Sequence, residues 1–374
     1  MIYLDHNATT PLDARVGDAM QPYLERFYGN PSGLYRLGRL CRSAVDTARE
    51  QVAALVGVDP SAVIFTSGGT EATNMALKGL PVTAGRRLLL TGATEHPSVS
   101  ETAAFLGGHG LVHRVIPVDE QGLPDPVFVE RQPGTELHCV SLMLANNETG
   151  AIHPVAELAD SVRQRSAWLH CDAVQAAGKI PVDFKALGVH LMTLSSHKIY
   201  GPKGVGALII DRAVTLQPLL HGGGQEQGLR GGTEAVAAIV GFGKAAELAR
   251  YELDARTRHV LALRQQLEAG LRQKTGCRIF AASTPRLPNT VQFALDGYDG
   301  ETVVMALDRR GIAVSSGSAC ASGAGEPSPV LTAMGIPAGV ARGAVRISLG
   351  QGNTPDEICQ LLDALETLPT PTFV

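Results

Sequence analysis

Between Val63 and Ile210, short apolar runs alternate with stretches of helical pattern. The apolar runs include LLLT at 88–91, LVHRVIPV at 111–118 and LHCVSLML at 137–144, and a helix is predicted for 154–165. Such alternation is typical of βαβ units, which form a mostly parallel sheet with helices on both faces. Because sheets of this class bind ligands outside the carboxyl ends of their strands, polar residues that follow these runs are the first candidates for a site.

The pattern changes near the end of a long helical tract at 233–275, which is apolar in its first part and densely charged from 247 to 258. After Gly276, the segments RIFAA, TVQFAL, IAVSSG and GAVRISLG, with helices expected near 301–310 and 354–365, indicate a compact α+β unit. We therefore predict a large α/β domain of residues 15–254 and a small α+β domain formed by residues 1–14 and 255–374.

Composition places the chain among ordinary globular proteins, since 44% of its 374 residues are hydrophobic and 18% are charged. The formal net charge of −4 gives no basic surface for nucleic acid or for an anionic membrane. No apolar run reaches the roughly 18 residues of a spanning helix, and the start, MIYLDHNATTP, does not resemble a secretory signal. A cytoplasmic protein that binds neither nucleic acid nor membrane is the simplest expectation.

The cysteines are scattered without a C-x-x-C pair, so the sequence predicts neither a disulfide framework nor a thiolate metal site. Cys139 and Cys171 lie in apolar runs and are expected to be inert core thiols. Cys320 differs, because it lies in SSGSACASGAGEPS, a segment with little apolar surface that is typical of an exposed, flexible loop. An exposed thiol in a reducing compartment is more often functional than structural.

Lys198 lies in LMTLSSHKIYGPKGVGALIID, in a polar, glycine-rich bend between two apolar runs. Most lysines are solvated charges, and most Gly/Pro bends are only turns. Here Ser195, Ser196 and His197 precede the lysine and offer hydrogen-bond donors to an anion, while nearby glycines allow close approach of the backbone. Lysine also condenses with carbonyl compounds, and pyridoxal phosphate is a cofactor that requires this chemistry.

Two other segments supply what such a cofactor needs. Asp172 ends the apolar run 168–172, and a carboxylate there can keep the pyridine nitrogen protonated, although an isolated aspartate is more often a turn or cap residue. Upstream, the run 63–66 leads through Ser67-Gly68-Gly69-Thr70 into a helical stretch at 71–78. A strand, a glycine turn and a helix start form an anion site, because free N–H groups and the helix dipole point at the anion.

Six motifs, together with YLDHNATTP and VRISLG at the two ends of the chain, carry a family resemblance. The motifs are SSHKIYGPKGVGAL, TSGGTEATNMALKG, HCDAVQAAGK, NNETGAIHPV, LRGGTEAV and SSGSACASGAGEPSPVL. They resemble the cysteine desulfurases of the NifS/IscS-like family, which are aminotransferase class V enzymes of pyridoxal phosphate fold type I. One departure is Tyr35 in GNPSGLYRLG, where members of the family commonly carry histidine.

The resemblance implies roles for individual residues. Lys198 would hold pyridoxal 5′-phosphate covalently and move protons at the substrate Cα, Asp172 would pair with the ring nitrogen, and Gln175 would bind the ring hydroxyl. His96 would stack on the ring and assist proton transfer, although a lone histidine after a strand is otherwise expected to be solvated or to cap a helix. The implied phosphate contacts are Gly69, Thr70, Ser195, His197 and, from the other subunit of a homodimer, Thr233. Asn147, which also contacts the cofactor, and Arg346 would fix the substrate carboxylate, a task that suits the planar fork of arginine.

The same resemblance makes Cys320 the nucleophile. Its thiolate would attack the sulfur of bound L-cysteine, release L-alanine and keep a persulfide for transfer to a sulfur-acceptor or iron–sulfur scaffold protein. The interval from Cys320 to Glu326 resembles the long-loop subgroup. A selenocysteine lyase or another class V aminotransferase-like enzyme remains the alternative, because selenium can leave without a thiol. A catalytically idle scaffold is disfavoured, since such a fold needs none of Lys198, Asp172 and His96.

Overall fold

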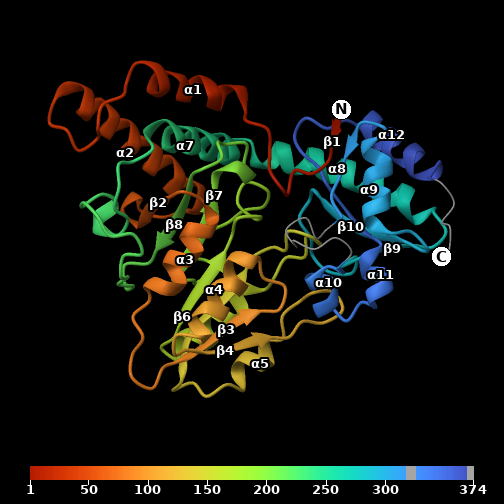
Figure 1. Ribbon diagram of the computed structural model, residues 1–374, viewed down its shortest axis with the longest axis horizontal. Coiled ribbons are helices and arrows are strands. Elements are labelled where there is room, and N and C mark those ends of the chain that lie inside the picture. Colours follow the sequence, from red (N-terminus) through yellow and green to blue (C-terminus); the bar gives the residue numbers. More distant parts are fainter. Residues whose placement is uncertain (317–325, 369–374) are drawn as a thin grey trace.

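A seven-stranded sheet forms the centre of the computed structural model, which describes residues 1–316 and 326–368 (Figure 1). The strand order is β2-β8-β7-β6-β5-β3-β4, and only β8 runs antiparallel to its neighbours. The mostly parallel sheet predicted from the sequence is therefore confirmed. The strands are β2 (Val63–Thr66), β3 (Leu88–Gly92), β4 (Val112–Ile116), β5 (Leu137–Met143), β6 (Trp168–Asp172), β7 (Leu191–Ser195) and β8 (Gly206–Ile210).

Both faces of this sheet are buried under helices. Neighbouring residues of β2 show the alternation, because Phe65 packs into the core that includes Val52 and Phe242, whereas Ile64 packs on the opposite face with Met75 and Val99. The helices of this part of the chain are α1 (Ala14–Glu25), α2 (Arg36–Val56), α3 (Gly69–Gly79), α4 (Pro97–Gly107), α5 (Pro126–Glu130), α6 (Val155–Gln164) and α7 (Val236–Tyr251).

The carboxyl ends of several strands meet at one edge of the sheet. Asp172 pairs with Thr193 between the parallel strands β6 and β7. Two successive antiparallel pairings turn β2 back into the direction of β7, so Thr66 and Ser195 both end at this edge and both face Gly206. The segments chosen from the sequence as a possible site therefore converge in space.

The last third of the chain forms a smaller layered unit on the right of Figure 1. Its three-stranded antiparallel sheet has β10 (Thr290–Leu295) between β9 (Cys277–Ile279) and β12 (Ala344–Ser348). The N-terminal strand β1 (Ile2–Tyr3) joins this unit by pairing in parallel with β11 (Ile312–Ala313). The helices are α8 (Leu253–Arg272), α9 (Gly300–Asp308), α10 (Pro329–Ala333), α11 (Ala338–Arg342) and α12 (Pro355–Glu366).

The larger and smaller units have separate cores, which supports the proposed division into domains. Leu4 packs with Leu267, Phe293 and Leu361 in the core of the smaller unit. The helical tract expected at 233–275 is interrupted at Glu252, where α7 ends and α8 begins. Buried residues of α7 belong to the large core, and those of α8, from Val260 onward, belong to the small core. We keep domain limits of 15–254, and of 1–14 with 255–374, as a proposal.

Local sequence explains how α12 begins. The Thr354 side chain accepts from the backbone N–H of Glu357, whose carboxylate accepts in return from the Thr354 N–H, and Pro355 follows the cap.

Among the described residues, no helix is both long enough and apolar enough to cross a membrane.

Candidate active site

Lys198 ends a short 3-10 turn, η2 (Ser196–Lys198), that directly follows β7. Its Nζ donates to the main-chain oxygens of Asn7 at 2.5 Å and Ala8 at 2.6 Å. The segment that leads from β1 to α1 turns at Asn7 and Ala8 and lies against the lysine, and its carbonyl groups fix the position of the amine. A lysine held at the carboxyl edge of a parallel sheet is well placed to react with a bound carbonyl compound.

Asp172 and His96 belong to the same electrostatic cluster as Lys198. Asp172 is buried at the end of β6, and its Oδ1 accepts from the Val174 N–H at 2.9 Å. Burial raises the pKa of Asp172, while the Val174 N–H, His96 and Lys198 act in the opposite direction. A protonated pyridine nitrogen would favour the charged carboxylate further, so this aspartate fits the ring-nitrogen partner of pyridoxal phosphate.

His96 caps a helix and also lies near two other predicted catalytic residues. It follows β3 and caps α4, because its Nδ1 accepts from the Ser98 N–H at 3.0 Å and Pro97 occupies the first helical position. Burial lowers the pKa of His96, and Asp172 partly opposes this effect. The cap fixes the position of the imidazole, and Asp172 and Lys198 remain near it.

The N-terminus of α3 forms the proposed phosphate cradle. A Cβ atom built on Gly206 would lie 2.6 Å from the carbonyl carbon of Gly68, so the two backbones approach each other as closely as glycine allows. A Cβ atom on Gly69 would lie 3.6 Å from the Cβ of Ser195, which places these two predicted contacts side by side. Thr70 is exposed at the first turn of the helix. This arrangement offers N–H and hydroxyl donors to one anion.

His197 lies beside the same cradle, in the turn that carries Lys198. Its Nδ1 is 3.2 Å from the Thr9 Oγ1. Burial, reinforced by Lys198, Lys203 and Lys179, lowers the pKa of His197 to about 4. The imidazole is therefore neutral near pH 7 and can give one N–H to a phosphate oxygen.

Arg346 and Asn147 are brought together from β12 and the segment after β5. The Arg346 Nη1 donates to the Asn147 main-chain oxygen at 3.1 Å, and its Nη2 pairs with Asp5 at 2.7 Å. Arg346 is only 3% exposed, and its Nε has no hydrogen-bond partner among the described residues. A buried guanidinium with a donor still to satisfy suits a substrate carboxylate.

Asn7 was missed as a functional candidate although its motif, YLDHNATTP, had been noted. The residue is 1% exposed, and its main-chain oxygen accepts from Lys198 and from the Gln175 Nε2, the latter at 2.9 Å. Its Nδ2 donates to Asn147 at 3.1 Å and to Thr290 at 2.9 Å. Asn7 thus connects Lys198, Gln175 and the proposed carboxylate site, so it acts as a buried hub of hydrogen bonds. This role becomes visible only in the folded structure, because the contacts join distant segments of the chain.

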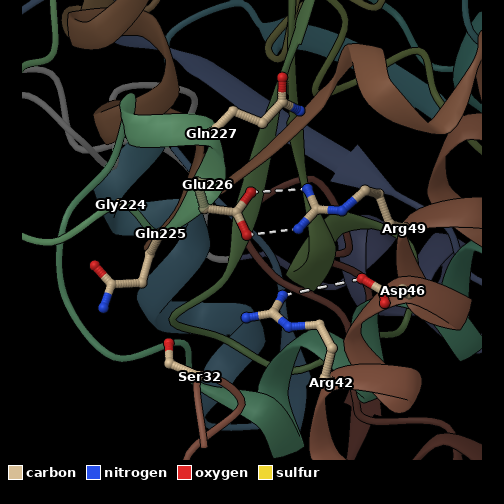
Figure 2. A pocket seen from close by; sticks show the side chains of 8 residues that line it. All are labelled: Ser32, Arg42, Asp46, Arg49, Gly224, Gln225, Glu226 and Gln227. Carbon is tan, nitrogen blue, oxygen red and sulfur yellow. Dashed lines mark hydrogen bonds and ion pairs between the residues drawn. The ribbon is translucent and has the colours of Figure 1, made fainter. Parts of the chain in front are cut away.

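Thr233 and Cys320 are not among the predicted site residues that the structure brings together. Thr233 is exposed, and the segment before it runs past a hollow of about 460 Å³ that is lined by residues such as Arg49 and Glu226 (Figure 2). Arg49 holds both Glu226 carboxylate oxygens, at 2.6 and 2.8 Å, and none of the predicted catalytic residues lines this hollow. Cys320 lies outside the described residues.

Two described serines that flank the segment with Cys320 in the sequence are held near Arg346. Ser315 forms a backbone bridge with Arg346, and the Ser328 Oγ donates to Glu148 at 2.6 Å. Burial raises the pKa of Glu148, and Arg346 is among the groups that oppose this effect. Both flanking serines are therefore anchored beside the proposed carboxylate site.

Comparison with known proteins identifies the family of this chain. The aminotransferase class-V family model matches residues 2–361. The cysteine desulfurase IscS of Dictyoglomus turgidum is 41% identical over 371 residues, which cover 98% of this chain and 94% of that protein. The chain belongs to the cysteine desulfurase family.

Solved structures place the chain in the same family. A NifS-like protein, 38% identical, matches with a TM-score of 0.92 and a coverage of 98% of both chains. SspA in complex with cysteine, 30% identical, matches with a TM-score of 0.82 and covers 95% of this chain and 100% of its own. Cysteine desulfurases depend on pyridoxal phosphate, so the sequence-based predictions of family, fold and cofactor are confirmed. The roles of single residues stay predictions.

Proposed function

We propose that this cysteine desulfurase converts L-cysteine to L-alanine and keeps the sulfur as a persulfide on Cys320. The convergence of Lys198, Asp172 and His96 at the carboxyl edge of the sheet, beside Arg346, carries the proposal. The bound cofactor supplies an electron sink that makes the substrate Cα acidic. A match to SspA in complex with cysteine supports the choice of substrate.

The residues of the chain divide the remaining work. Lys198 holds the cofactor and moves a proton at the substrate Cα, and the carbonyl groups of Asn7 and Ala8 orient its Nζ. Asp172 pairs with the ring nitrogen, and His96 covers the ring. The phosphate contacts are Gly69, Thr70, Ser195, His197 and the Thr233 of a second subunit.

Substrate binding and sulfur transfer use other groups. Arg346, with Asn147, binds the carboxylate of L-cysteine by charge-assisted hydrogen bonds. The Cys320 thiolate attacks the substrate sulfur, so a sulfur–sulfur bond forms as the bond between the substrate Cβ and its sulfur breaks. The electron pair of the broken bond stays with carbon and takes up a proton, which yields alanine.

We also propose that the chain acts as a homodimer in the cytoplasm and passes sulfur to an acceptor or iron–sulfur scaffold protein. Ion pairs close to Thr233 support the shared site: Arg230 binds Glu71 at 2.9 Å, and Glu234 pairs with Arg42. These contacts hold the segment on both sides of an exposed threonine. Such a segment suits a contact with a second copy of the chain.

Two variants test the proposed function. Cys320→Ser should keep the absorption band of the lysine-bound cofactor but release no alanine from L-cysteine, while Lys198→Ala should lose both the band and turnover. Each change should lower the rate by several orders of magnitude, because the two residues act in one sequence of steps. Release of alanine by Cys320→Ser at the wild-type rate would refute the nucleophile assignment and favour a selenocysteine-type lyase.

A further inference from the structure

A second lysine, Lys179, lies near Lys198 and has no role in the steps described above. Its Nζ is 2.7 Å from the Gln175 Oε1 and 2.8 Å from the Asn7 Oδ1. Lys179 and Lys198 also line the same small cavity, of about 30 Å³. Both lysines therefore bind Asn7, one through its side-chain oxygen and the other through its main-chain oxygen.

The chemistry of lysine determines how the two neighbouring amides are turned. Burial lowers the pKa of Lys179 well below its usual value, and Lys198 and Arg346 act in the same direction. Its Nζ donates one N–H to Gln175 and one to Asn7, whereas the two ends of an amide differ, one accepting and one donating. Both amides therefore turn an oxygen toward Lys179. With its Oε1 bound to Lys179, Gln175 must direct its Nε2 the other way, where it donates to the Asn7 main-chain oxygen at 2.9 Å.

The orientation of Gln175 matters for the cofactor. The Nε2 carries two hydrogens, and the bond to Asn7 uses one of them. The second hydrogen can be donated to the ring oxygen of pyridoxal phosphate. If the amide turned by half a revolution, Gln175 would present an oxygen to the ring oxygen, and the bond would be lost.

We propose that Lys179 is a positioning residue that fixes the Gln175 amide with its nitrogen toward the ring oxygen of the cofactor. The inference rests on the proposed contact between Gln175 and that ring oxygen. Lys179 acts through Gln175 and does not itself take part in the reaction. Its removal leaves the Gln175 oxygen without its hydrogen-bond donor and allows both amide orientations.

Cofactor affinity tests this inference without any measurement of turnover. Dissociation constants for pyridoxal phosphate are measured by absorbance titration of cofactor-free wild-type protein, Lys179→Met, Gln175→Leu and the double variant. Each single change should weaken binding about tenfold, as expected for the loss of one good hydrogen bond. The double variant should be no weaker than Gln175→Leu. The proposal would be overturned if the double variant bound the cofactor about a hundredfold more weakly than the wild type, which is the product of the two single losses. Wild-type affinity in Lys179→Met would overturn it as well.

A cofactor analogue without the ring hydroxyl separates positioning from a structural effect. Lys179→Met and the wild type should bind this analogue equally, because the bond that Lys179 secures is then absent in both. A tenfold loss for the analogue as well would show that Lys179 only supports the fold. Lys244→Met is the matched control, since Lys244 pairs with Glu247 on α7 and has a side chain that is 33% exposed. It should bind both compounds as the wild type does.

Gln175→Glu tests the orientation even if Lys179→Met does not fold. The carboxylate keeps an oxygen for Lys179 but has no N–H to donate, so its cofactor affinity should fall as it does in Gln175→Leu. Wild-type affinity in Gln175→Glu would mean that Gln175 presents an oxygen to the ring, which contradicts the proposal. Failure of the wild-type chain to bind pyridoxal phosphate would instead refute the proposed function. Unchanged binding in Gln175→Leu would refute only the inference.

Discussion

Replacement of Asn7 by alanine should destabilise the protein strongly while leaving the main-chain contacts of Lys198 in place. The side chain makes four hydrogen bonds, which are lost together. The main-chain oxygen that binds Lys198 and Gln175 is retained in alanine. The lost partners are Asn147, Thr290, Lys179 and Asn289.

The size of the effect follows from burial and from the number of bonds. Each intramolecular hydrogen bond contributes about 1 kcal/mol net, and a buried polar group left without its partner costs more. Asn7 is 1% exposed, so solvent cannot replace the four lost bonds, and the free energy of unfolding should fall by about 4 kcal/mol. A loss of this size is a large part of the stability of an ordinary protein domain.

Urea denaturation of the cofactor-free protein, followed by circular dichroism, measures this loss. Asn74→Ala is the matched control, because the Asn74 side chain makes one hydrogen bond, to Thr70 at 2.9 Å, and lies partly exposed on α3. It should cost about 1 kcal/mol or less. If Asn7→Ala lost no more stability than Asn74→Ala, the hub role assigned to Asn7 would be wrong.

Three further outcomes are expected. Arg346→Lys should raise the KM for L-cysteine about tenfold or more, because lysine lacks the Nε–H that Arg346 leaves available to the substrate carboxylate. Cofactor affinity should be unchanged, since Arg346 has no proposed contact with the cofactor, and an unchanged KM would count against this site. Glu226→Gln should weaken the dimer and the binding of pyridoxal phosphate, since Arg49 holds Glu226 in the segment before Thr233. Light scattering measures the dimer, and titrations compare the affinities for pyridoxal phosphate and for pyridoxal, which lacks the phosphate. Equal losses of affinity for the two compounds would contradict this prediction. Burial lowers the pKa of His153 from 6.5 to about 4, so the unfolded chain binds more protons in that interval and stability should fall as pH drops from 6.5 toward 4. His153→Gln should flatten this dependence in urea titrations, and an unchanged slope would exclude His153 as its source.

Local patterns were sufficient to predict the elements that carry the chemistry. Strand and turn signals at 63–70 and 191–201 lie within short windows, and the structure has β2, β7 and their following turns at these places. The edge at which Asp172 and Lys198 meet follows from the general behaviour of parallel sheets. Cys139 and Cys171 are buried as expected, and burial raises the pKa of Cys139 to about 12.

Contacts between distant segments could not be predicted in this way. Asp5 and Arg346 are 341 residues apart in the sequence, yet they form an ion pair. Lys179 ends the motif HCDAVQAAGK, and its contacts with Asn7 and Gln175 become visible only in the folded structure. Periodicity in one sequence predicts local elements, but it does not predict which N-terminal residue will contact which C-terminal strand.

The most direct test of the account is to identify the lysine that carries the cofactor. Purified protein reconstituted with pyridoxal phosphate is reduced with borohydride, digested and analysed by mass spectrometry. We expect one pyridoxyl adduct, on the peptide that contains Lys198, and none on the peptide that contains Lys179. An adduct on Lys179 in place of Lys198, or no lysine adduct at all, would contradict the proposed active site.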